Sequence, residues 1–305
     1  MRTRHTEHVI TVPAAADTVY DLIADAARWP AIFTPTVHVE YLPPAPGGEQ
    51  RLKIWAFAGG AVKCWVSHRT LDGAARRIGF RQTEPAAPVA AMRGEWTVVP
   101  SGAESRVVFR HWFSAEGDDA ALLDKIEEVV DRNSRAELDS LRAAAGRAHL
   151  LVDFEDEVAV GGGQQKVFGF LAEAGKWPGL IPHVARVELA EEPQGVQYLE
   201  MDTVESSGGD DVHTTVSVRV LLSPDTIVYK QTTLPAFLHA HVGSWHVRED
   251  GTTVARHTVV LKEEAITAVL GPEATVEQAG ALVRRSIGGN SVATLRRARE
   301  LVVAG

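Results

Sequence analysis

Residues 18–42 read TVYDLIADAARWPAIFTPTVHVEYL, and residues 166–190, 148 positions later, read KVFGFLAEAGKWPGLIPHVARVELA. Both stretches carry a Trp-Pro pair, Trp29-Pro30 in the first and Trp177-Pro178 in the second. Further landmarks recur in the same order, 146 to 157 positions apart: Ser67 and Arg69 with Ser217 and Arg219, Gly94 and Trp96 with Gly243 and Trp245, His111 with His257, and Asn133 with Asn290. Because ordered landmarks at a nearly constant offset indicate a tandem duplication, the sequence predicts two domains, residues 1–147 and 148–305.

Composition limits the class of protein. The chain has 305 residues, of which 45% are hydrophobic and 23% charged, as in soluble globular proteins. The net charge of −9 argues against nucleic acid as a partner. The single cysteine excludes an intramolecular disulfide and fits a reducing compartment. Since there is also no signal-peptide core or long apolar run, we expect a cytoplasmic protein that binds neither nucleic acid nor membrane.

The first copy has the pattern of an α+β domain. A strand ends at Pro13, a short helix with apolar residues at helical spacing follows, and the chain then alternates as strands. The expected strands are residues 36–42, 51–58, 62–70, 76–82, 92–99 and 106–114. Residues 117–146 form the longest helical pattern, with an apolar stripe that must be covered. We therefore expect two tandem domains, each a curved antiparallel sheet wrapped around a long C-terminal helix with an internal cavity.

The stretch KCWVSHR, Lys63–Arg69, raises the question of which strand face is buried. Alternation places Trp65, Ser67 and Arg69 together. An arginine in a strand is usually solvated, but this one shares its face with a tryptophan and recurs at Arg219. A guanidinium in a partly apolar cavity stays protonated, and its N–H donors can hold a ketone or enolate oxygen. Ser67 and Ser217 are either helpers of these arginines or ordinary strand serines.

His111 lies in an apolar row of the strand VVFRHWFS. A lone histidine in such a row is usually a core residue, but the recurrence at His257 makes a catalytic reading equally good. Histidine is suited to take up and return a proton near neutral pH. His68, on the face opposite Arg69, is expected to be structural or solvent-facing. The helix residues Asn133 and Asn290 are expected to hydrogen bond to a strand.

Aromatic residues supply a candidate wall for a flat ligand. The candidates for substrate contact are Trp65, Trp96, Phe57, Trp29 and Trp245. Recurrence alone is what core positions show, and we favour the core for Trp29 and Trp177 but the pocket wall for Trp65 and Trp96.

Metal and cofactor sites are not expected. His239, His241 and His246 lie close together in sequence, but strand alternation separates His246 from the other two, and no carboxylate or cysteine set accompanies them. VGGGQQK, residues 160–166, lacks the spacing of a phosphate-binding loop and is typical of a strand-to-helix turn.

Several motifs resemble one known family. ARWPAIF, WVSHR, GEW and RNSRAELDSL in the first copy, and KWPGLI, VSVR and GSW in the second, resemble the aromatase/cyclases of type II polyketide synthases. These are helix-grip proteins of the START/Bet v1-like superfamily. The doubled layout is similar to their didomain members, which are linked with first-ring cyclisation of reduced polyketides. Single-domain relatives often carry a tyrosine shortly after Trp-Pro, whereas Thr36 and Val184 stand here.

The resemblance implies an enzyme of antibiotic-type polyketide biosynthesis. It would catalyse regiospecific aldol closure and dehydration of the first aromatic ring, between carbons 7 and 12 of a ketoreduced poly-β-ketone. The implied partners are the acyl carrier protein that holds the substrate, a ketosynthase and a ketoreductase; no cofactor is needed. The candidate catalytic residues are Arg69, Ser67 and His111 in the first copy and Arg219, Ser217 and His257 in the second.

Two alternatives remain open at this point. The first is a non-catalytic carrier or sensor of a hydrophobic small molecule, because this fold serves both purposes. The second is that one copy is only a structural partner of the other. The residues also leave open the polyketide chain length, the ring formed, the general base, the oligomeric state and the order in which the domains act.

Overall fold

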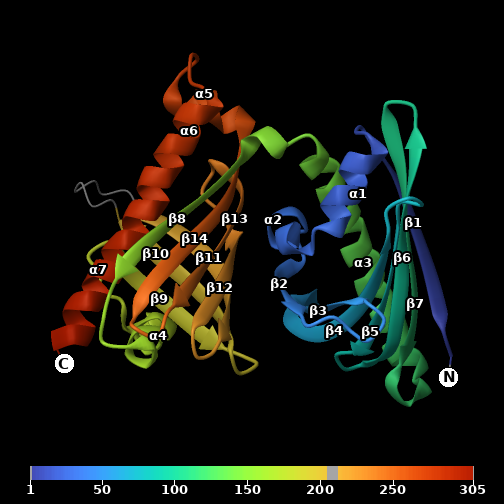
Figure 1. The fold of residues 1–305 in the computed structure, drawn as a ribbon, viewed down its shortest axis with the longest axis horizontal. Coiled ribbons are helices and arrows are strands. Elements are labelled where there is room, and N and C mark those ends of the chain that lie inside the picture. The colour runs from blue at the N-terminus through green and yellow to red at the C-terminus, as the bar shows by residue number, and fades with distance from the viewer. Residues whose placement is uncertain (1, 205–211, 305) are drawn as a thin grey trace. The chain divides into compact units, whose positions relative to one another are not determined.

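The computed structural model describes residues 2–204 and 212–304. The chain divides into two compact units, Met1–His149 and Leu150–Gly305. Each unit contains one seven-stranded antiparallel sheet followed by a long helix (Figure 1). The expected α+β class, with two tandem helix-grip domains, is therefore confirmed.

The first unit follows the predicted order closely. Its sheet runs β1-β7-β6-β5-β4-β3-β2, so the first strand pairs with the last. Its elements are β1 (Arg4–Val12), α1 (Ala16–Ala24), η1 (Ala26–Arg28), α2 (Trp29–Ile32), β2 (Thr36–Leu42), β3 (Gln50–Ala58), β4 (Ala61–Asp72), β5 (Arg77–Glu84), β6 (Val89–Ser101), β7 (Glu104–Ala115), η2 (Glu116–Asp118) and α3 (Ala120–Ala145).

Helix α3 forms because a cap and an apolar stripe coincide. The Asp119 side chain accepts hydrogen bonds from the backbone N–H groups of Ala121 and Leu122, which satisfies donors that have no partner within the helix. The stripe turns inward and packs on β1 and β7. Its buried members are Leu123, Ile126, Val130, Ser134, Leu138 and Leu141.

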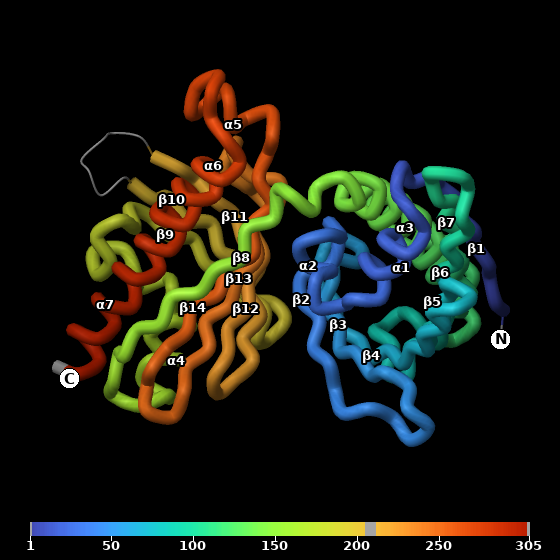
Figure 2. The backbone as a smooth tube through the Cα atoms, turned by 45° about the horizontal axis from the view of Figure 1, so that its top comes forward, coloured from blue at the N-terminus to red at the C-terminus, as the bar shows by residue number. Residues whose placement is uncertain are grey.

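The second unit repeats this architecture with the order β8-β14-β13-β12-β11-β10-β9 (Figure 2). Its elements, after the short turn η3 (Ala148–Leu150), are β8 (Leu151–Ala159), α4 (Gln164–Ala172), η4 (Ala174–Lys176), β9 (Val184–Glu191), β10 (Val196–Val204), β11 (Val212–Leu222), β12 (Thr226–Thr233), β13 (Leu238–Val247), β14 (Thr252–Leu261), α5 (Glu263–Leu270), α6 (Val276–Val283), η5 (Arg284–Gly288) and α7 (Gly289–Ala304).

The long helix of the second unit differs from α3 in one respect. It begins with a capping box between Thr275 and Gln278 and then passes through the π-helical turn η5 before continuing as α7. At Gly288 a Cβ atom would lie 2.7 Å from Asp156 Oδ2, so this turn approaches β8 closely. Turns of this kind are frequent at functional sites, and η5 contributes residues to the cavity described below.

The recurring glycine of GEW and GSW has a packing role in both sheets. Gly94 pairs with Phe80 on one side and His111 on the other, and Gly243 pairs in the same way with Tyr229 and His257. A Cβ on Gly94 would lie 2.3 Å from Phe80 Cζ, and one on Gly243 would lie 2.4 Å from Tyr229 Oη. The missing side chain therefore makes room for an aromatic ring that lies across the neighbouring strand.

Within the described residues, no helix is long and apolar enough to span a bilayer.

Candidate active site

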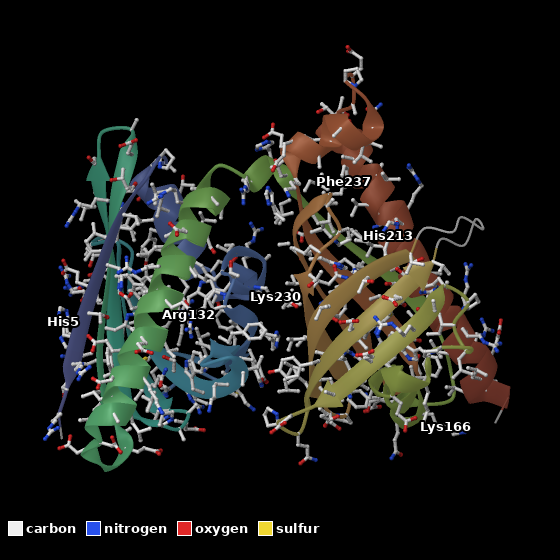
Figure 3. The ribbon with its side chains drawn as sticks, turned by 180° about the vertical axis from the view of Figure 1, so that it is seen from behind. His5, Arg132, Lys166, His213, Lys230 and Phe237 are labelled. Carbon is white, nitrogen blue, oxygen red and sulfur yellow. The ribbon has the colours of Figure 1, made fainter. Side chains whose placement is uncertain are left out.

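The second unit contains a partly open cavity of about 700 Å³. Its walls come from strands β10 to β14 on one side and from η5 and α7 on the other. Four predicted residues line it: Ser217, Arg219, Trp245 and His257. His213, labelled in Figure 3 near the start of β11, also belongs to the lining.

Arg219 is the main charged group of this cavity. Only 2% of its surface is exposed, and its guanidinium lies over the ring of Trp177, 5.5 Å from the ring centroid. Nη2 donates to the carbonyl of Leu171, close to the C-terminal end of α4. Nη1 is buried and has no hydrogen-bond partner among the residues that the structure describes. Burial lowers the pKa of Arg219 to about 10, so the side chain is still cationic at neutral pH and offers a free donor.

A second group of cavity residues forms a hydrogen-bonded network. His257 Nδ1 lies 2.9 Å from Tyr229 Oη and 3.2 Å from His241 Nε2. On its other side, His257 Nε2 lies 3.1 Å from Ser291 Oγ of α7. The network thus links three strands of the sheet to the helix across the cavity.

Burial keeps this network neutral. It lowers the pKa of His241 to about 3 and that of His257 to about 4; the neighbouring His257 adds to the first shift and Arg284 to the second. Burial also raises the pKa of the Tyr229 phenol above its usual value. At neutral pH the cavity therefore holds uncharged imidazoles and an intact phenol, which can exchange protons with a bound ligand.

The corresponding arginine of the first unit has more partners. Arg69 is 2% exposed and lies over Trp29, 5.2 Å from the ring centroid. It donates to the Ile23 carbonyl (3.1 Å) and the Ala24 carbonyl, which end α1, and also to Gln50 Oε1 (2.9 Å) and Tyr41 Oη (3.4 Å). These contacts use four of the five guanidinium N–H donors. Arg69 is therefore a helix-capping residue that keeps one N–H.

The difference between the two arginines follows from two sequence positions. Leu189 occupies the position of Tyr41, so Arg219 lacks the phenol. Gln197 faces Arg219 in register, as Gln50 faces Arg69, but it donates to the Ala172 carbonyl and to Glu191 instead. The second unit thus loses two partners of its arginine.

The predicted histidine and serine of the first unit also lie inside. His111 is 8% exposed, and its Nδ1 is 3.5 Å from Ser134 Oγ on α3. Burial, with a contribution from His8, lowers the pKa of His111 to about 3. Ser67 donates to the Arg81 carbonyl across the sheet, which is the behaviour of a strand serine. His68 is structural, since it contacts Glu49 on the opposite face.

Glu137 is a candidate site residue that the sequence patterns did not predict. It lies on α3, three residues after Ser134 and four after Asn133, whose Nδ2 donates to the Phe57 carbonyl as expected. Glu137 makes no hydrogen bond or ion pair with any other described residue, and burial raises the pKa of its carboxyl to about 8. Its counterpart Thr294 lines the cavity of the second unit. The sequence did contain one indication of this role: Glu137 follows Asn133 by four residues and so lies on the same face of the helix.

The aromatic predictions have mixed outcomes. Trp65 lies on the inner face with Ser67 and Arg69 and packs on the cluster around Ile54, as expected. Trp96, predicted to be pocket wall, packs in the core cluster of the first unit, where its ring centroid lies 3.5 Å from that of Phe109.

Phe57 departs from the prediction, whereas Trp29 and Trp177 pack in the core as predicted. The pleat of β3 places Phe57 with Lys53 and Trp55, on the face opposite Ile54, and not toward the interior. Trp29 packs in the core as expected, and its indole donates to the Ile23 carbonyl. Trp177 is a core residue too, but it also lines the cavity.

The histidine cluster does not assemble into a metal site. A bulge between Leu238 and Ala240 breaks the alternation of β13, so His239 lies near Glu264 while His241 faces His257. His246 contacts Thr226. Among the described residues, no group of three potential ligands is close enough to hold a metal ion.

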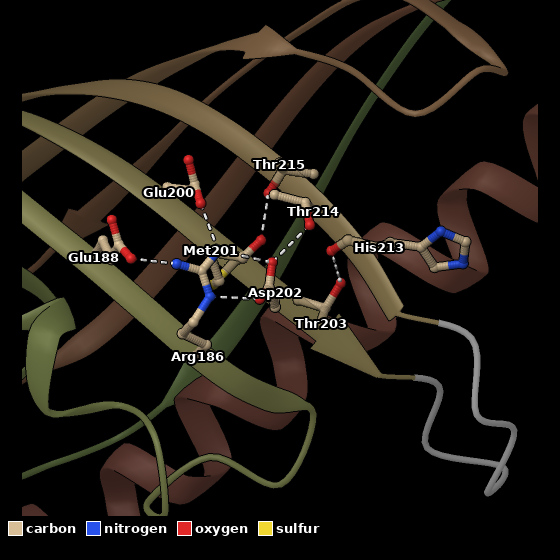
Figure 4. A network of polar contacts seen from close by, with 9 residues as sticks. All are labelled: Arg186, Glu188, Glu200, Met201, Asp202, Thr203, His213, Thr214 and Thr215. Atoms are coloured by element: carbon tan, nitrogen blue, oxygen red, sulfur yellow. Dashed lines mark hydrogen bonds and ion pairs between the residues drawn. The ribbon is translucent and has the colours of Figure 1, made fainter.

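The largest ion-pair network among the described residues of the second unit lies away from the cavity. Arg186 contacts Glu188, Glu200 and Asp202, and Asp202 also accepts from Thr214 (Figure 4). Alternation sets Glu200 and Asp202 opposite Leu199 and Met201, which line the cavity. This network therefore stabilises the outer face of the sheet, and the cavity keeps Arg219 as its buried cation.

Comparisons with known proteins agree with this architecture, which is that of ligand-enclosing helix-grip proteins. The family model described as "Polyketide cyclase / dehydrase and lipid transport" matches residues 3–146. The granaticin polyketide synthase bifunctional cyclase/dehydratase of Streptomyces violaceoruber is 40% identical over 96% of this chain and 93% of its own length. The actinorhodin counterpart of Streptomyces coelicolor is 41% identical over 95% and 94%.

Two solved structures extend the likeness to both domains. The di-domain aromatase/cyclase BexL of the BE-7585A pathway has a TM-score of 0.86 and 43% identity, and covers 97% of this chain and 98% of its own. StfQ of the steffimycin pathway has a TM-score of 0.82 and 37% identity over 98% of both chains. The chain therefore belongs to the didomain aromatase/cyclases of the polyketide cyclase family, and it is a bifunctional cyclase/dehydratase enzyme.

Proposed function

We propose that this enzyme closes the first ring of a ketoreduced poly-β-ketone by an aldol reaction between carbons 7 and 12 and then removes water to aromatise it. The observation that carries the proposal is a pair of interiors, each with a buried arginine over a tryptophan and a neutral histidine on the inner face of β7 or β14. An arginine can hold a developing enolate oxygen, and a neutral histidine can accept the proton of the attacking carbon.

In the first unit, we assign the proton transfers to His111 and Glu137. The neutral imidazole of His111 takes the proton from the attacking carbon. Glu137 is protonated at neutral pH, so it can donate to the carbonyl oxygen that becomes the hydroxyl group. Arg69 directs its remaining N–H and its charge toward the same oxygen. In this proposal the side chains around Arg69 and His111 restrict which carbon meets which carbonyl, and this selection is the main task in cyclising a reactive chain.

The proposed substrate is bound to an acyl carrier protein, and the proposed neighbours are a ketosynthase and a ketoreductase. Three relatives are components of polyketide synthases, and the single cysteine fits work in the cytoplasm. The cavity of about 700 Å³ in the second unit is large enough for a folded chain of this kind.

The test is reconstitution with a minimal polyketide synthase and a ketoreductase. The wild-type protein should replace mixed shunt products by one aromatic first ring. His111→Ala and Glu137→Gln should each lower ring formation about 100-fold, in the usual range for loss of a general acid or base. His5→Gln is the matched control, because His5 is exposed on β1 (Figure 3).

The result that overturns the proposal is a product mixture that the wild-type protein leaves unchanged. If the protein then also binds a planar aromatic ligand with a 1:1 stoichiometry, the carrier reading replaces the catalytic one.

A further inference from the structure

The two interiors differ in polarity at positions that the duplication makes equivalent. We infer that the cavity of the second unit is a separate dehydration site for a cyclic β-hydroxy ketone, with His241 and Tyr229 as its proton-transferring residues and Arg219 as its oxygen-binding residue. This inference rests on the proposed function, because it assigns one of the two proposed steps to one cavity.

The first support is a pair of buried polar atoms that have no protein partner. Arg219 Nη1 and His241 Nδ1 make no hydrogen bond to the part of the chain that the structure describes. Both residues line the cavity, and they are only 2% and 5% exposed. An unsatisfied buried polar atom costs roughly 1–3 kcal/mol. Gln231 Oε1, in the same lining, is a third such atom, and the three together indicate that a bound ligand supplies the partners.

The second support is the difference between the copies. Tyr229 pairs with Gly243 just as Phe80 pairs with Gly94, so the two rings occupy equivalent places. His241 corresponds to Met92 by the same offset of 149 residues. The second unit therefore carries a phenol and an imidazole where the first carries a phenyl ring and a thioether. The volume is conserved, while at these two positions only the second copy has groups that can transfer a proton.

The third support is the connection between these groups. Tyr229 Oη lies 3.5 Å from His241 Nε2 and 2.9 Å from His257 Nδ1, and His257 also reaches Ser291. A proton that enters at His241 Nδ1 can therefore leave from Nε2 toward the phenol, directly or through His257. His257 and Ser291 orient the pair and are positioning residues.

These groups account for every proton and electron pair that moves in the dehydration. Arg219 Nη1 donates a hydrogen bond to the ketone oxygen, and His241 Nδ1 takes the proton from the carbon between the ketone and the hydroxyl-bearing carbon. The electron pair of that C–H bond forms the new C=C bond as the C–O bond breaks. The departing hydroxyl receives the Tyr229 proton and leaves as water, and Tyr229 regains a proton from His241 Nε2. No oxidant, reductant or cofactor is consumed.

The equivalent residues of the first copy supply the test variants. Tyr229→Phe and His241→Met install the residues of the first copy at equivalent places, so they conserve packing. His246→Gln is the matched control, because His246 lies on the same strand but is exposed and contacts Thr226. Circular dichroism and thermal unfolding should show the wild-type fold for all three.

The measurement is the ratio of cyclised, still hydroxylated product to aromatic product in the reconstituted system. Tyr229→Phe and His241→Met should lower the dehydration rate about 100-fold, so that the hydroxylated ring accumulates while the total of ring-closed product is unchanged. A wild-type product ratio from both variants overturns the inference and leaves the proposed function intact. A wild-type protein that forms no ring overturns the proposed function instead.

The division of effects between KM and kcat separates a catalytic role from a structural one. Arg219→Lys keeps the positive charge but not the fork of donors. It should weaken binding of an aromatic β-hydroxy ketone probe, seen as a higher KM at nearly constant kcat. Tyr229→Phe should lower kcat at nearly constant KM at every pH. The reverse assignment of these two effects would contradict the roles given to Arg219 and Tyr229.

Discussion

Replacing Arg69 by alanine should destabilise the protein more than the equivalent replacement of Arg219. Arg69 donates to two carbonyls at the end of α1, whereas Arg219 donates to the single carbonyl of Leu171. Hydrogen bonds from a charged group contribute about 1.5–3 kcal/mol each. Counting only the bonds to backbone carbonyls, at the low end, Arg69→Ala should cost at least about 3 kcal/mol, since it also loses the bonds to Gln50 and Tyr41, and Arg219→Ala should cost about 1.5 kcal/mol.

Thermal unfolding followed by circular dichroism at neutral pH measures the difference. For a domain of about 150 residues, 1 kcal/mol corresponds to roughly 2–4 °C in Tm. Arg69→Ala should therefore lower the Tm by roughly 6–12 °C, and Arg219→Ala by roughly half as much. Equal shifts, or a larger shift for Arg219→Ala, would refute the view that Arg69 caps α1 while Arg219 keeps a free donor.

Other predictions concern pH, packing and capping. The pKa of Glu137 is raised from 4.5 to about 8, so the folded state holds a proton that the unfolded state has lost; stability should fall as pH rises through this range, and Glu137→Gln should flatten the fall. The pKa of His257 is lowered from 6.5 to about 4, so stability should also fall as pH drops across that range, less steeply in His257→Gln. Gly94→Ala should cost about 1–3 kcal/mol in denaturant unfolding, whereas Gly146→Ala, which meets open space, should cost far less. Thr275→Ala should cost about 1 kcal/mol in the same assay through loss of the capping box.

Local patterns were sufficient to predict most elements of the first unit. The strand expected at 36–42 is β2, and the helix expected at 117–146 is α3, Ala120–Ala145. Alternation also predicted that Trp65, Ser67 and Arg69 share one face, because the side-chain period of a strand is a local property, and the recurrence at Arg219 indicated that this face is the inner one. The second copy followed by its repeat offset, although the π-helical turn η5 has no counterpart in α3.

Site geometry was harder to predict because it depends on distant partners. The donors of Arg69 meet carbonyls of α1 and the phenol of Tyr41, which lie 45, 46 and 28 residues away. One bulge in β13 separates His239 from His241 and removes the metal option. Glu137 is one of many acidic residues on an amphipathic helix, and only its place against the sheet distinguishes it from a solvated side chain.

The paired glycines have a consequence for how duplicated domains diverge. Because Gly94 and Gly243 have no side chain, each leaves a space on its strand that the ring of either phenylalanine or tyrosine can fill. Phe80 and Tyr229 differ there by one oxygen atom, so one copy can gain or lose a hydroxyl without a change in volume. The glycine thus fixes the size of the side chain that fits, while the hydroxyl group on its ring is free to vary. After duplication, one nucleotide substitution that exchanges phenylalanine and tyrosine is enough to alter the reactivity of one domain's interior and leave that of the other domain unchanged.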